Sequence, residues 1–223
     1  MQPSRTALVT GGITPTTLAI AGKLEAEGCR VFIAGSNDSI AANTAGAWPH
    51  CIVADPNDES AIQQALQNVS EAAVIGGCLD VLVTVAEGSY DGSAANIDAA
   101  RIAAASAQIL AAPMLYTKAA LPFLRQARDP AIVHVAPVSA FMLETNVLGP
   151  VLNNALVNYS RQCVPQLPGI RINAACPGGD TTTPEGVAAL VAFMASTRGS
   201  YLNSAVVTVD GGWYATHPRA MPQ

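Results

Sequence analysis

Paired glycines between an apolar strand and a helix are the first residues of this chain that could do chemistry. The stretch VTGGITPTTLAIAGKLEAEGCRVFIAG, residues 9–35, predicts a strand, a turn, a helix and a second strand. Glycines in such a turn let the backbone approach a pyrophosphate, which the N–H groups at the helix N-terminus then bind. Gly11 and Gly12 are present, but Pro15 and Thr17 stand where the turn needs its second and third glycines.

Thr14 and Pro15 still predict a good helix start, because Thr caps helices and Pro is tolerated in the first turn. Pro15 has no N–H to offer a phosphate, and the Thr17 side chain is expected to project into space that a phosphate needs. The turn is therefore predicted to keep its fold while losing room and donors for a phosphate. A hydroxyl could still supply one contact, so residual dinucleotide binding stays open.

Four other side chains could do chemistry, and each has a plain structural interpretation. Ser139 is expected to be an ordinary hydroxyl after a strand, and Asp180 to cap a turn. Cys176 is expected to fill apolar space before Pro177 and Gly178. Tyr159 is expected about two and a half turns into its helix, away from the strand ends.

Cysteine and histidine show no metal-binding pattern, so no metal site is expected. The five cysteines are far apart and form no CxxC pair: Cys29, Cys51, Cys78, Cys163 and Cys176. Buried free thiols in a reducing compartment are the simplest interpretation, which places the chain in the cytoplasm.

The amino-acid composition limits the kinds of partner that this chain is expected to bind. Of the 223 residues 50% are hydrophobic and 12% are charged, about half the usual charged share. A net charge of −5 without a basic stripe argues against nucleic acid, and no apolar run reaches the roughly 18 residues of a membrane span. So little charge predicts large apolar faces buried against other subunits.

The elements expected around these residues alternate between strand and helix. Strands are predicted at 7–10, 30–34, 50–53, 81–85, 131–135, 171–176 and 205–209, and helices at 16–27, 59–70, 98–125, 147–164 and 184–196. Alternation of this kind predicts a single α/β domain over 1–212, a Rossmann-like doubly wound parallel sheet of about seven strands with helices on both faces. Residues 213–223 are expected to form a C-terminal tail.

Read in this order, the whole chain resembles the short-chain dehydrogenase/reductase family. The resemblance runs from the opening stretch through VADPNDESAIQQAL, LDVLVTVAEG and GIRINAACPGG to TPEGVAALVAFMASTRGSYLNSAVVTVDGGW. It implies the fold above and a dinucleotide-dependent hydride transfer.

The family's catalytic residues are absent at the matching positions. The resemblance implies a Tyr acid/base, a Lys that lowers its pKa, a Ser and an Asn, and these positions hold Pro150, Asn154, Pro137 and Ile109. A Tyr alone titrates near 10, so the cation is needed for base chemistry at neutral pH. The Tyr–Arg pair of the cofactor-free halohydrin dehalogenases is also missing. No catalytic residue is therefore expected.

The cofactor positions are also altered. NAD-selecting members usually have an acid where Gly35 stands, and NADP-selecting members an Arg near Ser36. Asp55 matches the adenine-contacting acid but has an equally good structural use as a helix cap, and Glu87 would repel phosphates. Gly11, Gly12 and Asp55 are thus vestigial, and no cofactor is expected, or NAD(P) if any.

The resemblance then implies a non-catalytic subunit that assembles with an active homologous NAD(P)-dependent dehydrogenase, expected as a tetramer. This is similar to the alcohol dehydrogenase of anaerobic toluene (benzylsuccinate) degradation, which pairs active and inactive subunits. The tail with Trp213 and Tyr214 could reach a neighbour's substrate site or be a frayed end. Two alternatives stay open: a nucleotide-sensing regulator, and an atypical NAD(P)-dependent oxidoreductase with other active-site residues.

Overall fold

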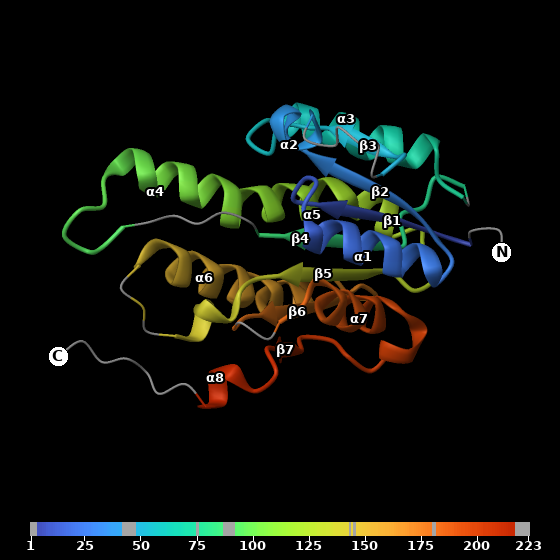
Figure 1. Cartoon of the computed structure of the whole chain (residues 1–223). Coiled ribbons are helices and arrows are strands. Elements are labelled where there is room, and N and C mark those ends of the chain that lie inside the picture. The colour runs from blue at the N-terminus through green and yellow to red at the C-terminus, as the bar shows by residue number, and fades with distance from the viewer. Residues whose placement is uncertain are drawn as a thin grey trace.

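The computed structural model of the chain describes residues 4–41, 48–74, 76–86, 92–142, 144, 146–179 and 182–216. Seven short segments form one sheet in the order β3-β2-β1-β4-β5-β6-β7, and every neighbouring pair is parallel (Figure 1). Their bounds are β1 Arg5–Thr10, β2 Cys29–Gly35, β3 Cys51–Val53, β4 Val81–Val85, β5 Ala131–Val135, β6 Arg171–Pro177 and β7 Val206–Val209. The predicted fold class is confirmed.

Helices cover both faces of this sheet. They are α1 Pro15–Ala26, α2 Asn37–Ala41, α3 Glu59–Glu71, α4 Ala99–Ser106, the π-helical η1 Ala107–Ala111, α5 Ala112–Leu124, α6 Leu148–Cys163, α7 Pro184–Ala195 and α8 Trp213–Thr216, with short 3-10 segments η2 Val138–Phe141, η3 Val164–Gln166 and η4 Thr197–Gly199. Side chains of α1 and α7 share one core with the sheet, and those of α3, α5 and α6 share another on the opposite face. Strands such as VLVTV and AIVHV are buried throughout, as expected of a parallel sheet covered on both sides.

The chain changes direction across the sheet between β1 and β4. After β3 at one edge it returns to pair β4 with β1, so that Thr10 lies beside Thr84 and beside Ala34. Open α/β sheets bind ligands outside the carboxyl ends of the strands at such a switch in strand order. The Gly11–Gly12 turn follows β1 directly and so lies at this position.

The prediction of one long helix at 98–125 is wrong in one respect. The structure divides it into α4, the π-helical η1 and α5. Pro113 in the first turn of α5 has no N–H to donate to the preceding turn, which favours a local change in hydrogen bonding. The short helices α2 and α8 were also not predicted.

All five cysteines are free thiols, as predicted, although Cys51 and Cys78 are partly exposed rather than buried. No helix in the described part of the chain has both the length and the apolar composition needed to cross a bilayer.

Candidate functional site

The two surviving glycines of the β1–α1 turn are required by the fold itself. Gly11 has φ +117°, and a Cβ there would lie 2.9 Å from the Val85 carbonyl oxygen. Gly12 has φ +78°, and a Cβ there would lie 2.6 Å from the Cβ of Ser39 in α2. Both positions therefore demand glycine for conformation and for space, whether or not a phosphate ever binds.

The helix after the turn uses its hydrogen-bonding groups internally. Thr14 is the N-cap of α1 and Pro15 the first helical residue, as predicted. Thr14 Oγ1 accepts a hydrogen bond from Thr17 N at 3.1 Å, and Thr14 N donates to Thr17 Oγ1 at 2.9 Å. The fully buried Thr17 hydroxyl also donates to Gly12 O at 2.7 Å. This capping box stabilises the helix end and takes up donors that could otherwise bind a phosphate.

The end of β2 packs directly on the glycine turn. A Cβ at Gly35 would lie 2.5 Å from the Cα of Gly12 and would also meet the Ser39 hydroxyl. Ser39 is fixed there because its hydroxyl donates to Ser36 O at 2.9 Å and its N–H donates to Ser36 Oγ at 3.3 Å. An acidic side chain at position 35, of the kind that holds a ribose, therefore has no room.

Asp55 lies in an exposed turn after β3. Its carboxylate accepts hydrogen bonds from Asn57 N at 2.9 Å and Asn57 Nδ2 at 3.1 Å. The interpretation of Asp55 as a helix cap is wrong, because Asp58 caps α3 by accepting from Ser60 N and Ala61 N. Glu87 lies outside the described residues.

Apolar packing surrounds the positions at which a hydride-transferring site would need polar groups. Ile109 in η1 is 1% exposed and belongs to a cluster that we call the apolar plug: Ala86, Ile109, Ala136, Ala140, Leu156, Val157, Ala174 and Cys176. Pro137 precedes η2, and the next residue, Val138, packs on the backbone of Gly178. Neither Ile109 nor Pro137 carries a side-chain hydrogen-bonding group.

The two α6 positions are equally inert. Pro150 is the third residue of α6, where the first helical turn tolerates a missing N–H. Asn154 lies one turn later, and its Nδ2 donates to Ala140 O at 2.9 Å. Asn154 thus ties α6 to η2, and its neutral amide supplies neither a proton nor a cation.

The other candidate side chains within the described residues do not assemble into a reactive group. Cys176 is fully buried in the apolar plug, and burial raises the pKa of its thiol to about 12. Tyr159 packs its ring on His134 at a centroid distance of 5.8 Å, and burial raises the pKa of its hydroxyl. Ser139 lies within η2 after β5, as predicted. Asp180 lies outside the described residues.

Sequence reasoning missed a buried polar pair in the middle of the sheet. His134 of β5 is fully buried, and its Nδ1 lies 2.6 Å from Thr84 Oγ1 of β4. Burial lowers the pKa of the His134 ring to about 4, so the imidazole is neutral at pH 7. The alternating strand pattern places both residues on the face toward α5 and α6, but a lone histidine in an apolar strand gave no signal of a partner.

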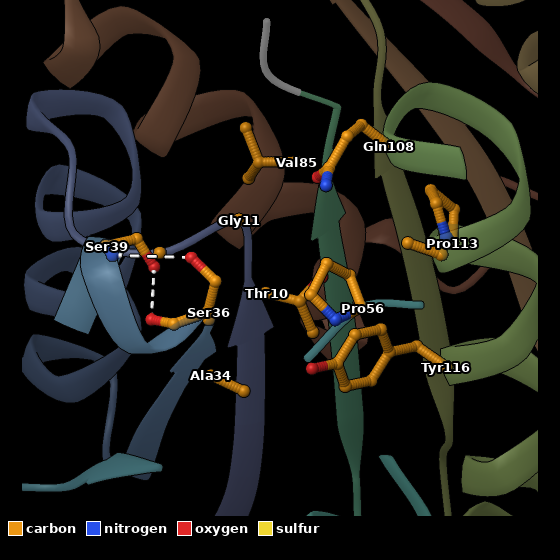
Figure 2. Close-up of a pocket in the computed structure, with 13 residues that line it drawn as sticks. Thr10, Gly11, Ala34, Ser36, Ser39, Pro56, Val85, Gln108, Pro113 and Tyr116 are labelled. Atoms are coloured by element: carbon orange, nitrogen blue, oxygen red, sulfur yellow. Dashed lines mark hydrogen bonds between the residues drawn. The ribbon is translucent and has the colours of Figure 1, made fainter. Parts of the chain in front are cut away.

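The cavity at the carboxyl ends of β1, β2 and β4 is small. Its volume is about 110 Å³, below the roughly 300–1,000 Å³ of most small-molecule pockets. Figure 2 shows Tyr116 and Gln108 reaching toward it from α5 and η1, opposite Ser36 and Ser39. Sequence reasoning considered Ser36 only as a place without a cofactor-selecting Arg, and it missed Ser39, Gln108 and Tyr116, because only the fold brings α2 and the α4–α5 helix to the same turn.

The described part of the C-terminal tail packs on its own chain. Tyr214 of α8 lies against Phe141 of η2 with ring centroids 6.2 Å apart, and Trp213 packs on Gly179. The buried Asp210 holds this turn by accepting from Tyr214 N at 2.8 Å. Six residues, 178–183, separate β6 from α7, and Trp213 of α8 contacts Gly179 within this connection. The residues after Thr216 lie outside the described part of the chain.

Within the described residues, no three His, Cys, Asp or Glu side chains gather in a way that could hold a metal ion.

Comparisons with known proteins agree with this architecture. The chain is 28% identical over 250 aligned residues to the rhamnolipids biosynthesis 3-oxoacyl-[acyl-carrier-protein] reductase of Pseudomonas aeruginosa, covering 94% of this chain and 96% of that protein. It is 26% identical over 246 residues to 2-(S)-hydroxypropyl-CoM dehydrogenase 3 of Xanthobacter autotrophicus, covering 93% and 95%. A solved dehydrogenase/reductase of Sinorhizobium meliloti superposes with a TM-score of 0.83 at 25% identity, over 94% and 95% of the two chains.

The sequence profile described as "short chain dehydrogenase" matches residues 5–151. This match spans the glycine turn, the switch in strand order and the first turn of α6, and it covers more than half of the chain. The chain therefore belongs to the short-chain dehydrogenase family.

Proposed function

We propose that this chain is a non-catalytic subunit of an oxidoreductase, which assembles with an active homologous NAD(P)-dependent dehydrogenase. The observation that carries the proposal is the apolar plug around Ile109 together with Pro137, Pro150 and Asn154. Hydride transfer to a carbonyl needs a group that donates a proton at neutral pH and a cation or neighbour that tunes it. None of these four residues can donate such a proton, because three are apolar and the amide of Asn154 does not titrate.

The neighbouring groups do not replace the missing acid. The thiol of Cys176 has a pKa raised to about 12 by burial, and Tyr159 lies on the α5–α6 side of the sheet with its pKa also raised by burial. Lys118, on α5, is engaged with Glu59 at 2.6 Å. These contacts favour a scaffold that has no catalytic activity. They argue against an oxidoreductase that uses substituted active-site residues.

Assembly is supported by three exposed large apolar side chains, Ile102 of α4, Met114 of α5 and Val151 of α6, whose surface we call the α4–α6 face. Figure 1 shows α4 and α6 side by side, extending beyond the strands of the sheet. In α4 only Ala105 is buried. No charged residue occurs between Arg101 and Lys118, or in α6 before Arg161. Exposing such an apolar face to water is unfavourable, and its composition is typical of an interface with another helix pair.

The partner in this proposal is a short-chain dehydrogenase with an intact site, because a solved dehydrogenase/reductase shares this fold with a TM-score of 0.83 and so has a helix pair in the same place. A chain that lacks a catalytic proton donor can take part in oxidoreduction only in a complex with a chain that has this donor. A nucleotide-sensing regulator is less well supported, because the cavity of about 110 Å³ has no charged side chain among its described lining residues.

Co-expression with the short-chain dehydrogenases encoded next to this gene tests the assembly. We expect a stable complex containing both chains, resolved by size-exclusion chromatography and native mass spectrometry. Val151→Arg places a charge on the α4–α6 face and is expected to weaken association about 100-fold or more, because the charge loses its water on binding. Gln67→Arg, on the exposed side of α3, is the matched control and is expected to change association less than about 3-fold.

A chain that purifies alone as a stable homotetramer, and takes no dehydrogenase partner on co-expression, contradicts this proposal. Equal complex formation by Val151→Arg and Gln67→Arg contradicts the choice of face.

A further inference from the structure

A larger cavity lies at the other end of the sheet, at the amino ends of β1, β4 and β5. Its volume is about 310 Å³, which reaches the roughly 300–1,000 Å³ of most small-molecule pockets. The lining comes from the start of β1, the residues before β4, the loop between α5 and β5, and Thr197 of η4. Figure 1 shows that the amino ends of these strands point away from α4, so this cavity is separate from the glycine turn.

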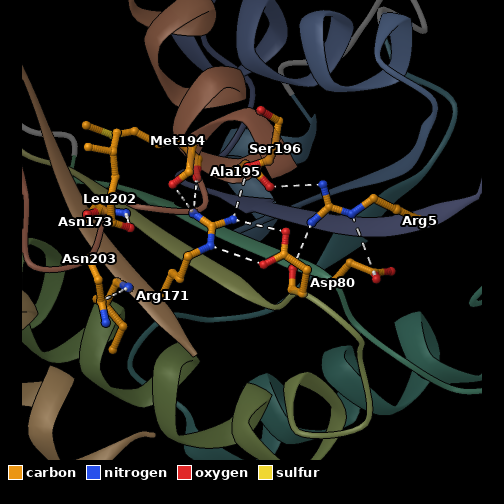
Figure 3. Close-up of polar contacts among 12 residues, drawn as sticks. Arg5, Asp80, Arg171, Asn173, Met194, Ala195, Ser196, Leu202 and Asn203 are labelled. Carbon is orange, nitrogen blue, oxygen red and sulfur yellow. Dashed lines mark hydrogen bonds and ion pairs between the residues drawn. The ribbon is translucent and has the colours of Figure 1, made fainter. Parts of the chain in front are cut away.

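The guanidinium of Arg5 stands at the wall of this cavity. Its Nη2 donates to Asp129 O at 3.2 Å and its Nη1 donates to Ala195 O at 2.9 Å, which holds the group between the β5 loop and the end of α7. Its Nε lies 3.9 Å from Asp80 Oδ1, which makes a loose ion pair. Figure 3 shows Arg5 between Asp80 and Ala195. A guanidinium has five N–H groups, so these contacts leave donors for a ligand.

The charged side chains at this cavity leave one cation in excess. The carboxylate of Asp129 pairs with Arg171 at 3.2 Å, and that of Asp80 lies beside Arg5. Arg128 also lines the cavity, is exposed, and has neither an ion pair nor a side-chain hydrogen bond with the described residues. Guanidinium groups bind carboxylates through paired hydrogen bonds, so the lining favours a ligand with one negative charge.

The rest of the lining is small and weakly polar. Ala127 and Thr197 offer methyl groups, and the stems of the two arginines add apolar surface. The partly exposed Cys78 thiol donates to Gln126 O at 3.3 Å. A ligand whose charged end meets the arginines therefore has apolar surface on which to bury an uncharged body.

We propose that this cavity binds a small monocarboxylate that has an apolar body. The carboxylate accepts hydrogen bonds from Arg5 and Arg128, and the apolar body contacts Ala127, Thr197 and Cys78. The proposal does not depend on assembly with a dehydrogenase, since every lining residue belongs to this chain.

Isothermal titration of the purified full chain with hexanoate, hexanamide and acetate tests the proposal. We expect hexanoate to bind with a Kd of about 1 mM or below. Hexanamide lacks the charge and acetate lacks most of the apolar body, so each is expected to bind at least about 10-fold more weakly. Absence of hexanoate binding overturns the proposal, and so does binding of hexanamide or acetate as tight as that of hexanoate.

Arg128→Gln locates the carboxylate, with Arg125→Gln as the matched control. Arg125 is also exposed and lies at the end of the same helix, but it does not line the cavity. We expect hexanoate to bind about 10-fold more weakly to Arg128→Gln, and less than about 2-fold more weakly to Arg125→Gln. Both positions are on the surface, so both variants are expected to fold. Equal affinity in the two variants overturns the placement of the carboxylate at Arg128.

The thiol of Cys78 reports on the same cavity, with the partly exposed Cys51 of β3 as the reference thiol. Alkylation by iodoacetamide is followed at both cysteines by peptide mass spectrometry. At about ten times its Kd, hexanoate is expected to slow alkylation of Cys78 about 10-fold and to leave Cys51 unchanged. Unchanged alkylation of Cys78, or equal slowing at both cysteines, overturns the site, whatever the outcome of the co-expression test.

Discussion

Replacing Arg171 with methionine is expected to lower the free energy of unfolding by about 3–5 kcal/mol. The guanidinium donates from Nη1 to Met194 O at 2.6 Å and Gly199 O at 3.1 Å, and from Nη2 to Ser196 O at 3.2 Å. Its Nε also pairs with Asp129 Oδ1 at 3.2 Å, and the Arg171 side chain is only 10% exposed. Figure 3 shows the Arg171 guanidinium with its contacts as dashed lines. Methionine fills similar space but leaves the end of α7 and a carboxylate without their donor.

Chemical denaturation of Arg171→Met beside Arg198→Met measures this effect. Arg198 pairs with Glu27 at 3.1 Å, but its side chain is 66% exposed, so its loss is expected to cost less than about 1 kcal/mol. Arg171→Lys keeps the charge without the planar fork and is expected to fall between wild type and Arg171→Met. A loss below about 1 kcal/mol in Arg171→Met contradicts the role assigned to these contacts.

Acidification is expected to destabilise the fold through His134. Burial lowers the pKa of this ring to about 4 in the folded state, against about 6.5 in an unfolded chain. The unfolded state therefore binds more protons between these values, and stability falls as the pH drops from about 6.5 toward 4. A shift of this size corresponds to about 3 kcal/mol once the pH reaches the lower value.

Denaturation curves of wild type and His134→Gln between pH 4 and 7.5 isolate this contribution. Asp80 has a pKa raised by burial, but it is present in both proteins, so the difference between their curves reports His134. We expect the wild type to lose about 3 kcal/mol more than the variant on acidification. Parallel curves contradict a neutral buried imidazole, as does an NMR titration that places the ring pKa near 6.5.

The sheet was predictable because its strands are short apolar runs separated by turn residues. The runs at 81–85 and 131–135 coincide with β4 and β5, and the other strands differ from prediction by one or two residues at their ends. The short helix α2 could not be predicted, because SNDSIA has no apolar periodicity and the helix forms against the glycine turn. The π-helical η1 escaped prediction because it depends on local hydrogen bonding around Pro113.

Less of the site could be predicted. The substituted positions 15, 17, 137, 150 and 154 are visible in the sequence, since each residue type lacks the required group. The surroundings of these positions are not visible in the sequence, because the apolar plug joins residues between Ala86 and Cys176 that lie far apart in the chain. The contact of Ser39 with Gly12 depends on tertiary packing that no local pattern encodes.

Turnover by the chain alone is the most direct test of the proposal that it is not catalytic. The protein is purified free of any other short-chain dehydrogenase and incubated with NAD(P)H and ketones, or with NAD(P)⁺ and secondary alcohols, while nicotinamide absorbance is followed. Pro150 and Asn154 stand where the resemblance implies the proton acid and its tuning cation, so the predicted result is a rate equal to that of the heat-denatured protein. Steady oxidation or reduction that co-elutes with the chain, and persists after a second purification step, is the result that contradicts a non-catalytic subunit.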